Sequence, residues 1–187
     1  MNKVEAIQAL MQHIAADDLV VCCNGMIGRE LYTYGERPGN FYMIGSMGLG
    51  LSIGLGLALA QPHKRVVVLD GDGNVLMGMN ALASVGSERP NNLRHIVLDN
   101  QTHGSTGGQR TISGEIHLDQ VAVAAGYLTS RRAESLEAFA TALGAAFSEP
   151  GPTMVLGLVE GGTIKGIGRV KETPPELTAR FSAEAQR

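Results

Sequence analysis

Three segments place polar side chains and glycine directly after short apolar runs, and each could bind a ligand. They are Asn24-Gly25, Asp70-Gly71-Asp72-Gly73 and Asp99-Asn100. The apolar runs before them are typical of buried β-strands. Because ligands of an open α/β sheet bind beyond the carboxyl ends of its strands, we expect the three segments to contribute to one site.

The middle segment suits both a phosphate and a metal ion. Gly71 and Gly73 let the backbone approach a phosphate, and the helix expected after Gly73 offers free N–H groups. Asp72 beside a phosphate indicates a bridging divalent ion, since Mg²⁺ favours one or two protein oxygens together with phosphate oxygens and water. The amide of Asn100, at the end of the next strand, could supply a second oxygen.

Other patterns compete with this interpretation. Gly73 and Gly78 have the glycine spacing of a P-loop, but Met79-Asn80 replaces the required Lys-Ser/Thr, and the sequence has no GxGxxG. Residues 50–54 match the pattern of a nucleophile elbow, but no clear strand leads into them. An ordinary strand-end turn at Asp72 stays open on these observations alone.

The same residues carry a resemblance to a known family. Gly71-Asp72-Gly73, followed at the family's spacing by Asn100, resembles the GDG…NN motif of thiamine diphosphate (ThDP) enzymes, with Asp99 in place of the first asparagine. Gly45-Ser46-Met47-Gly48 resembles the segment that holds the cofactor in its bent shape. The resemblance covers nearly the whole chain and matches the pyrophosphate-binding (PP) half of the pyruvate-decarboxylase-like enzymes. Residues 25–31 and 103–109 look most like sulfopyruvate decarboxylase β subunits and phosphonopyruvate decarboxylases.

This resemblance implies roles for individual residues. Asp72, the Asn100 side chain and the Thr102 backbone carbonyl would coordinate Mg²⁺. Met47 would be the apolar wedge under the cofactor, and the Gly45 carbonyl would accept a hydrogen bond from its aminopyrimidine. The other residues expected to bind ThDP are Gly25, Ser46, Gly71, Gly73, Asn74, Gly104 and Ser105.

The resemblance also implies an activity, the conversion of 3-sulfopyruvate to sulfoacetaldehyde and CO2. His103 is the expected catalytic residue, which would bind the anionic 2-oxoacid or move a proton, although an exposed loop histidine is an equal alternative. Phosphonopyruvate is the second substrate, and Gly104 weakens that assignment because many phosphonopyruvate enzymes have Asp there. Another 2-oxoacid decarboxylase or carboligase, and a regulatory subunit that binds the cofactor without turnover, remain as alternatives.

The resemblance further implies a partner chain. The glutamate that activates the cofactor lies on the pyrimidine-binding (PYR) half of these enzymes, which would be a separate α subunit. The chain would therefore form a homo- or hetero-oligomer, through an apolar face expected around Met26, Met43 and Met47.

Alternating helix and strand patterns predict the scaffold that positions these residues. Helices are predicted over 2–15, 28–34, 46–60, 74–85 with Asn74 as N-cap, 119–125 and 135–147, and strands over 19–23, 41–44, 65–69, 95–98, 127–130 and 152–159. The alternation predicts an α/β fold, a three-layer αβα sandwich with a mostly parallel sheet. Residues 101–114 are predicted to be a polar loop, and 160–187 a C-terminal tail of a single domain that spans 1–187.

Composition narrows the functional class. The chain has 187 residues, of which 44% are apolar and 18% charged, which suits one domain with a buried core. A formal net charge of −3 argues against a protein that binds nucleic acid or an anionic membrane. The uncharged segment 43–60 could be a membrane span, but its glycines favour a buried helix. The N-terminus lacks the pattern of a signal peptide, so we expect a cytoplasmic protein.

Overall fold

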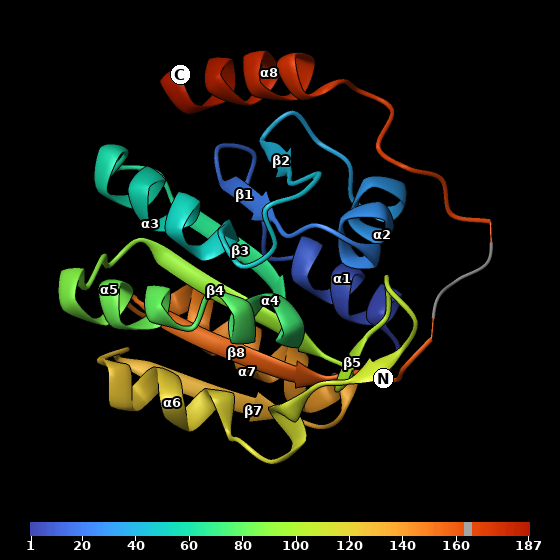
Figure 1. Ribbon diagram of the computed structural model, residues 1–187. Coiled ribbons are helices and arrows are strands. Elements are labelled where there is room, and N and C mark those ends of the chain that lie inside the picture. Colours follow the sequence, from blue (N-terminus) through green and yellow to red (C-terminus); the bar gives the residue numbers. More distant parts are fainter. Residues whose placement is uncertain (163–165) are drawn as a thin grey trace.

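A six-stranded parallel sheet lies at the centre of the computed structural model, which describes residues 1–162 and 166–187 (Figure 1). The strand order is β2-β1-β3-β4-β8-β7. The bounds are β1 (Leu19–Cys22), β2 (Asn40–Tyr42), β3 (Val66–Gly71), β4 (Leu93–Asp99), β7 (Thr129–Ala133) and β8 (Thr153–Leu158). Every residue of β1, β3 and β4 is buried, which agrees with the apolar runs in these strands. In β4 the apolar run 96–98 follows the buried polar residues Arg94 and His95.

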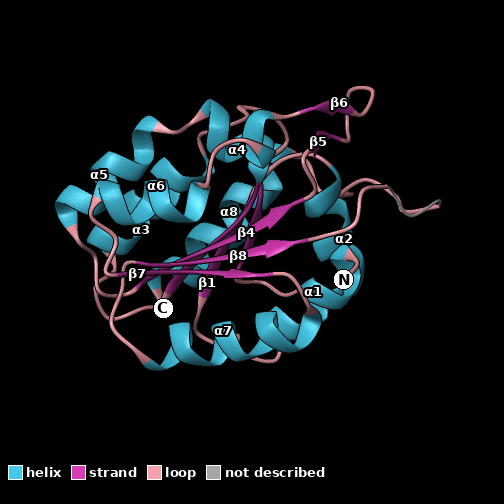
Figure 2. Ribbon diagram, turned by 90° about the horizontal axis from the view of Figure 1, so that it is seen from below, coloured by secondary structure: helices cyan, strands magenta, loops and turns pink. Residues whose placement is uncertain are grey.

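Helices cover both faces of this sheet (Figure 2). One face carries α1 (Lys3–Met11), α2 (Met26–Tyr34) and α7 (Leu136–Ser148), and the other carries α3 (Gly50–Ala60), α4 (Asp72–Met77), α5 (Asn80–Glu88) and α6 (Leu118–Ala125). Each helical layer packs its apolar side against the sheet, so the molecule has two cores separated by the strands. The predicted three-layer αβα sandwich is therefore confirmed.

Helix α3 packs unusually close to the sheet through its glycines. A Cβ atom on Gly54 would lie only 2.2 Å from Cγ2 of Val68 in β3, so a larger residue would push the helix away. The helix starts at Gly50 rather than at Ser46, and Ile53 on its outer side is exposed. Among the described residues, no helix combines the length and the apolar character that crossing a membrane would require.

Two segments near the carboxyl ends of the strands differ from the prediction. The helix predicted over 74–85 is two helices, α4 and α5, and α4 begins already at Asp72 with Gly71 as its N-cap. Asn74 is not an N-cap, because its side-chain Oδ1 accepts the backbone N–H of Gly48 at 3.0 Å. The loop predicted over 101–114 contains a small antiparallel hairpin of β5 (Thr102–His103) and β6 (Gln109–Arg110), followed by the 3₁₀ turn η1 (Ile112–Gly114).

The C-terminal segment also differs, because it ends in the helix α8 (Pro174–Gln186). This helix lies along the edge strand β2 (Figure 1), where the rings of Phe181 and Phe41 are 5.3 Å apart. Leu177 and Phe181 of α8 are buried in the two cores. The last residues of the chain therefore cover one edge of the sheet.

Candidate functional site

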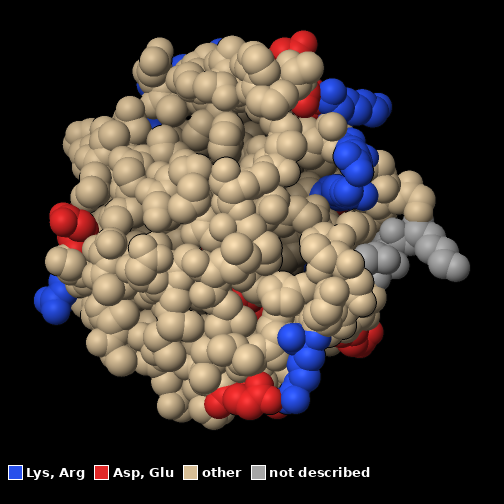
Figure 3. Space-filling model, viewed as in Figure 1, with Lys and Arg blue, Asp and Glu red and all other residues tan. Residues whose placement is uncertain are grey.

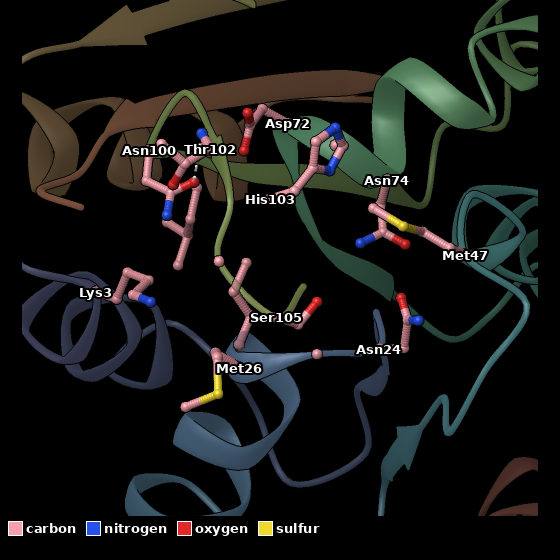
Figure 4. A pocket seen from close by; sticks show the side chains of 16 residues that line it. Lys3, Asn24, Met26, Met47, Asp72, Asn74, Asn100, Thr102, His103 and Ser105 are labelled. Atoms are coloured by element: carbon pink, nitrogen blue, oxygen red, sulfur yellow. Dashed lines mark hydrogen bonds between the residues drawn. The ribbon is translucent and has the colours of Figure 1, made fainter. Parts of the chain in front are cut away.

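The three polar segments meet in one pocket beyond the carboxyl ends of β1, β3 and β4 (Figure 4). The predicted site residues that line it are Gly25, Met47, Gly71, Asp72, Gly73, Asn74, Asn100, Thr102, His103, Gly104 and Ser105. The pocket measures about 60 Å³, which is room for a few water-sized groups. It therefore suits an ion and a small polar group rather than an entire large ligand.

Gly45 and Ser46 lie outside this pocket. Both are exposed and line a neighbouring apolar groove with Leu49 and Ile53. A Cβ atom on Gly45 would have no neighbour within 4 Å, so the space beside its backbone is open. A second molecule or a bound group could contact this stretch directly.

Asp72 is buried at the start of α4 and is held by side chains from the segment after the hairpin. Thr111 Oγ1 donates to Asp72 Oδ2 at 2.5 Å, and Ser113 Oγ lies 3.3 Å from the same oxygen. Ser113 Oγ is also 2.9 Å from Oδ1 of the buried Asp99. Burial raises the pKa of Asp72, the Asp99 charge raises it further, and the Thr111 hydrogen bond opposes both. A cation would relieve this cost, because it favours the ionised carboxylate.

Asn100 and Thr102 lie beside Asp72 in the wall of the pocket (Figure 4). Asn100 Oδ1 accepts the backbone N–H of Thr102 at 3.2 Å, and Asp99 Oδ1 accepts that of Gln101 at 2.9 Å, so two side chains fix the tip of this turn. Within 1–162 and 166–187, no group of three or more His, Cys, Asp or Glu could hold a metal. An ion here would bind one carboxylate together with amide and carbonyl oxygens, which is the hard donor set that Mg²⁺ prefers.

Gly73, His103 and Met47 pack together on the other wall. A Cβ atom on Gly73 would lie 2.7 Å from His103 Nδ1 and 3.0 Å from Met47 Cε, so a side chain here would displace His103 or Met47. Asn74 holds the Met47 loop through its bond to the Gly48 N–H, while its amide nitrogen points into the pocket (Figure 4). The β3–α4 turn and the loop before α3 are thereby fixed to each other.

Several residues of the site were missed by the sequence analysis. Thr111 and Ser113 hold Asp72, and Lys3 of α1 reaches the pocket, where its Nζ is 3.2 Å from Oε1 of Glu30. Glu30 is fully buried, and burial raises its pKa against the opposing effect of Lys3. No spacing in the sequence connects these residues to the Gly71-Asp72-Gly73 segment, so only the fold could identify them.

The prediction that Met26, Met43 and Met47 form an exposed apolar face is wrong for these three residues. Met43 is buried, because its N–H donates to the Cys22 carbonyl at 3.0 Å and continues β2 into the sheet. Met26 and Met47 are half-buried in the pocket wall. Exposed apolar side chains nearby are Ile44, Leu49 and Ile53, which line the groove beside Gly45 and Ser46.

Comparisons with known proteins agree with this geometry. Residues 21–156 match the family described as thiamine pyrophosphate enzyme, C-terminal TPP binding domain, where thiamine pyrophosphate (TPP) is another name for ThDP. Phosphonopyruvate decarboxylase from Streptomyces viridochromogenes is 45% identical over 182 residues, which are 97% of this chain and 46% of that protein. The chain thus spans about half the length of that relative.

Two further comparisons cover the chain differently. Sulfopyruvate decarboxylase subunit beta from Methanococcus maripaludis is 36% identical over 181 residues, which are 97% of this chain and 96% of the subunit. The X-ray structure of a candidate thiamin diphosphate-dependent enzyme from Mycobacterium smegmatis superposes with a TM-score of 0.76 at 20% identity. That match covers 87% of this chain and 32% of the solved one, and it supports the fold alone.

Proposed function

The chain belongs to the thiamine pyrophosphate enzymes, and from this premise we propose that it is the PP subunit of a ThDP- and Mg²⁺-dependent 2-oxoacid decarboxylase. One observation carries the proposal. Asp72 and Asn100 directly follow the neighbouring parallel strands β3 and β4, and they line one pocket with Gly71, Gly73 and the start of α4. This arrangement offers oxygen ligands for a metal and free N–H groups for a diphosphate in the same small space.

Each residue then has a role in holding the cofactor. Asp72, Asn100 Oδ1 and the Thr102 carbonyl would bind Mg²⁺, and the amide nitrogen of Asn74 would donate to the diphosphate. The backbone near Gly25, Gly73, Gly104 and Ser105 lines the same pocket and would approach the diphosphate oxygens.

The open end of the site would hold the rest of the cofactor. Met47 would support the cofactor from below, and Gly45 and Ser46 in the adjoining groove would hold its pyrimidine end. When bound, ThDP supplies the electron sink for loss of CO2, and the protein binds and orients it. His103, packed against Gly73, would bind the substrate or transfer a proton.

The match to a β subunit over nearly its full length supports sulfopyruvate as the substrate and a separate α subunit as the partner. The chain would then be a single PP domain, and the PYR glutamate would come from the partner. Phosphonopyruvate is the second candidate, favoured by the 45% identity to a phosphonopyruvate decarboxylase.

The exposed apolar residues mark where the partner would dock. Ile44, Leu49 and Ile53 lie beside the groove that contains Gly45 and Ser46. Figure 3 shows that the middle of this face is largely free of Lys, Arg, Asp and Glu. Association would bury these side chains and enclose the open end of the cofactor site.

Reconstitution tests the proposal. The chain is mixed with its PYR-domain partner, ThDP and Mg²⁺, and CO2 release is measured from sulfopyruvate, phosphonopyruvate and pyruvate. We expect turnover only in the complete mixture, with sulfopyruvate the best substrate. Turnover of pyruvate alone would contradict the substrate assignment, and unchanged ThDP binding by Asp72→Ala would contradict the metal assignment.

A further inference from the structure

A second cavity lies beside the cofactor pocket. The two share Asn24, Gly25 and Ser105 in their walls, so they are neighbours across the turn after β1. The second cavity measures about 320 Å³. Its walls also contain Arg29 of α2 and Arg169 of the segment before α8.

The charged side chains that line this cavity are all positive among the described residues. No Asp or Glu is among the described residues that line it, and neither arginine has a described carboxylate within 4.0 Å. Another cavity that adjoins the cofactor pocket is lined by Glu5, Glu30 and Glu160 together with a single cation among its described residues, Lys3. Figure 3 shows Lys and Arg side chains gathered on the side of the molecule where α2 and the segment before α8 lie. Of these two cavities that adjoin the cofactor pocket, the one with the arginines would therefore favour an anion.

We propose that Arg29 and Arg169 bind the terminal tetrahedral oxyanion, a sulfonate or a phosphonate, of the 2-oxoacid substrate. The inference rests on the proposed decarboxylase function. A guanidinium presents N–H donors in a fixed fork and keeps its charge at all relevant pH values, so it suits an anion with several acceptor oxygens. Ser105, whose Oγ would lie 3.7 Å from a Cβ on Gly25, stands at the border of the two cavities. Its hydroxyl would donate to the same end of the substrate.

The chemistry of decarboxylation explains why the arginines would bind this end of the substrate. The carboxylate of a 2-oxoacid leaves as neutral CO2, so a cation beside it would stabilise the starting anion and slow the reaction. The terminal oxyanion keeps its charge from substrate to product, so arginines can hold it without this penalty. A separate cavity across Gly25 from the metal ligands keeps the two charges of the substrate apart.

The test uses the enzyme assembled from the chain, its PYR-domain partner, ThDP and Mg²⁺. Arg29→Gln and Arg169→Gln are compared with Arg132→Gln, which removes an arginine from β7 at the opposite edge of the sheet. We expect each of the first two variants to lower kcat/KM for sulfopyruvate or phosphonopyruvate roughly tenfold to a hundredfold, the effect of losing a hydrogen bond to a charged group. Pyruvate, which has the same reacting end but no terminal oxyanion, should change less than about twofold. The Arg132 variant should match the wild type with every substrate.

Three results would overturn the subsite. They are an equal loss with pyruvate, no loss with the oxyanion substrates, and a loss that sedimentation analysis traces to failed subunit assembly. If the assembled enzyme decarboxylates no 2-oxoacid, the proposed function fails, and the subsite is judged by calorimetric titration of the full chain with sulfoacetate and acetate. Preferential sulfoacetate binding that disappears in Arg29→Gln would still support an oxyanion site, whereas equal binding of both probes would exclude it.

Discussion

Replacing Thr111 by valine removes one hydroxyl from the partners of Asp72 and keeps the shape of the side chain. Both residues are buried, and the Thr111 Oγ1 donor lies 2.5 Å from Asp72 Oδ2. A hydrogen bond to a charged group contributes about 1.5–3 kcal/mol, and Ser113 at 3.3 Å cannot fully replace it. Groups that orient a metal ligand typically change metal affinity 10–100-fold, so we expect Mg²⁺ binding in the presence of ThDP to weaken by about that factor.

The same variant should shift the pH dependence of metal binding. The Thr111 hydrogen bond lowers the pKa of Asp72, so its removal raises that pKa, and loss of Mg²⁺ on acidification should begin at a higher pH than in the wild type. Isothermal calorimetry at a series of pH values measures both effects. Thr129→Val is the matched control, because it also removes a hydroxyl donor from a carboxylate, at Glu149 and away from the site. An affinity and pH midpoint equal to those of the control would refute the role of Thr111.

Three further predictions follow from the same geometry. Burial raises the pKa of Asp72, so the free energy of unfolding of the metal-free chain should fall as pH rises from the ordinary Asp range through that pKa. Urea unfolding at a series of pH values should show this fall in the wild type and a smaller one in Asp72→Asn. Gly73→Ala should lower ThDP affinity at least about tenfold, because the new methyl group would displace His103 and Met47, whereas alanine at the open Gly56 should leave affinity unchanged in the same titration. Leu49→Glu should prevent association with the PYR-domain partner in sedimentation experiments. It should not lower the melting temperature, because Leu49 is 52% exposed. The control Leu128→Glu changes a residue that is also 52% exposed but lies outside the proposed docking face, and it should associate normally.

The sequence could predict the sheet and the meeting of the site residues, because the apolar runs mark the strands and a parallel sheet places the strand ends together. Strands β1 and β3 contain continuous apolar runs, and β4 contains the shorter run 96–98, because these strands are covered on both faces. Their polar ends meet because parallel strands end at one edge of a sheet. The metal and cofactor roles assigned to Asp72 and Asn100 remain predictions, although both side chains line one pocket.

Helix α8 could not be predicted from composition, because its segment is polar and contains two prolines. Proline is nevertheless compatible with the first turn of a helix, and Pro174 occupies that position. Thr173 and Glu176 form a capping box there, which is a helix-start signal within the polar segment. The helix is stabilised by burying Leu177 and Phe181 against an edge strand, which is a tertiary effect.

The buried carboxylates of Asp72 and Asp99 lower the stability of the fold rather than raise it. Asp72 and Asp99 are both buried, and together with Thr111 and Ser113 they form one cluster with no described cationic side chain in it. Two carboxylates so placed repel each other, and apolar residues of similar size would stabilise the chain more. A cation that joins the cluster would offset this repulsion, so the stability of this chain and its capacity to bind a metal are coupled. Added Mg²⁺ with ThDP should therefore raise the melting temperature of the wild type and leave that of Asp72→Asn unchanged.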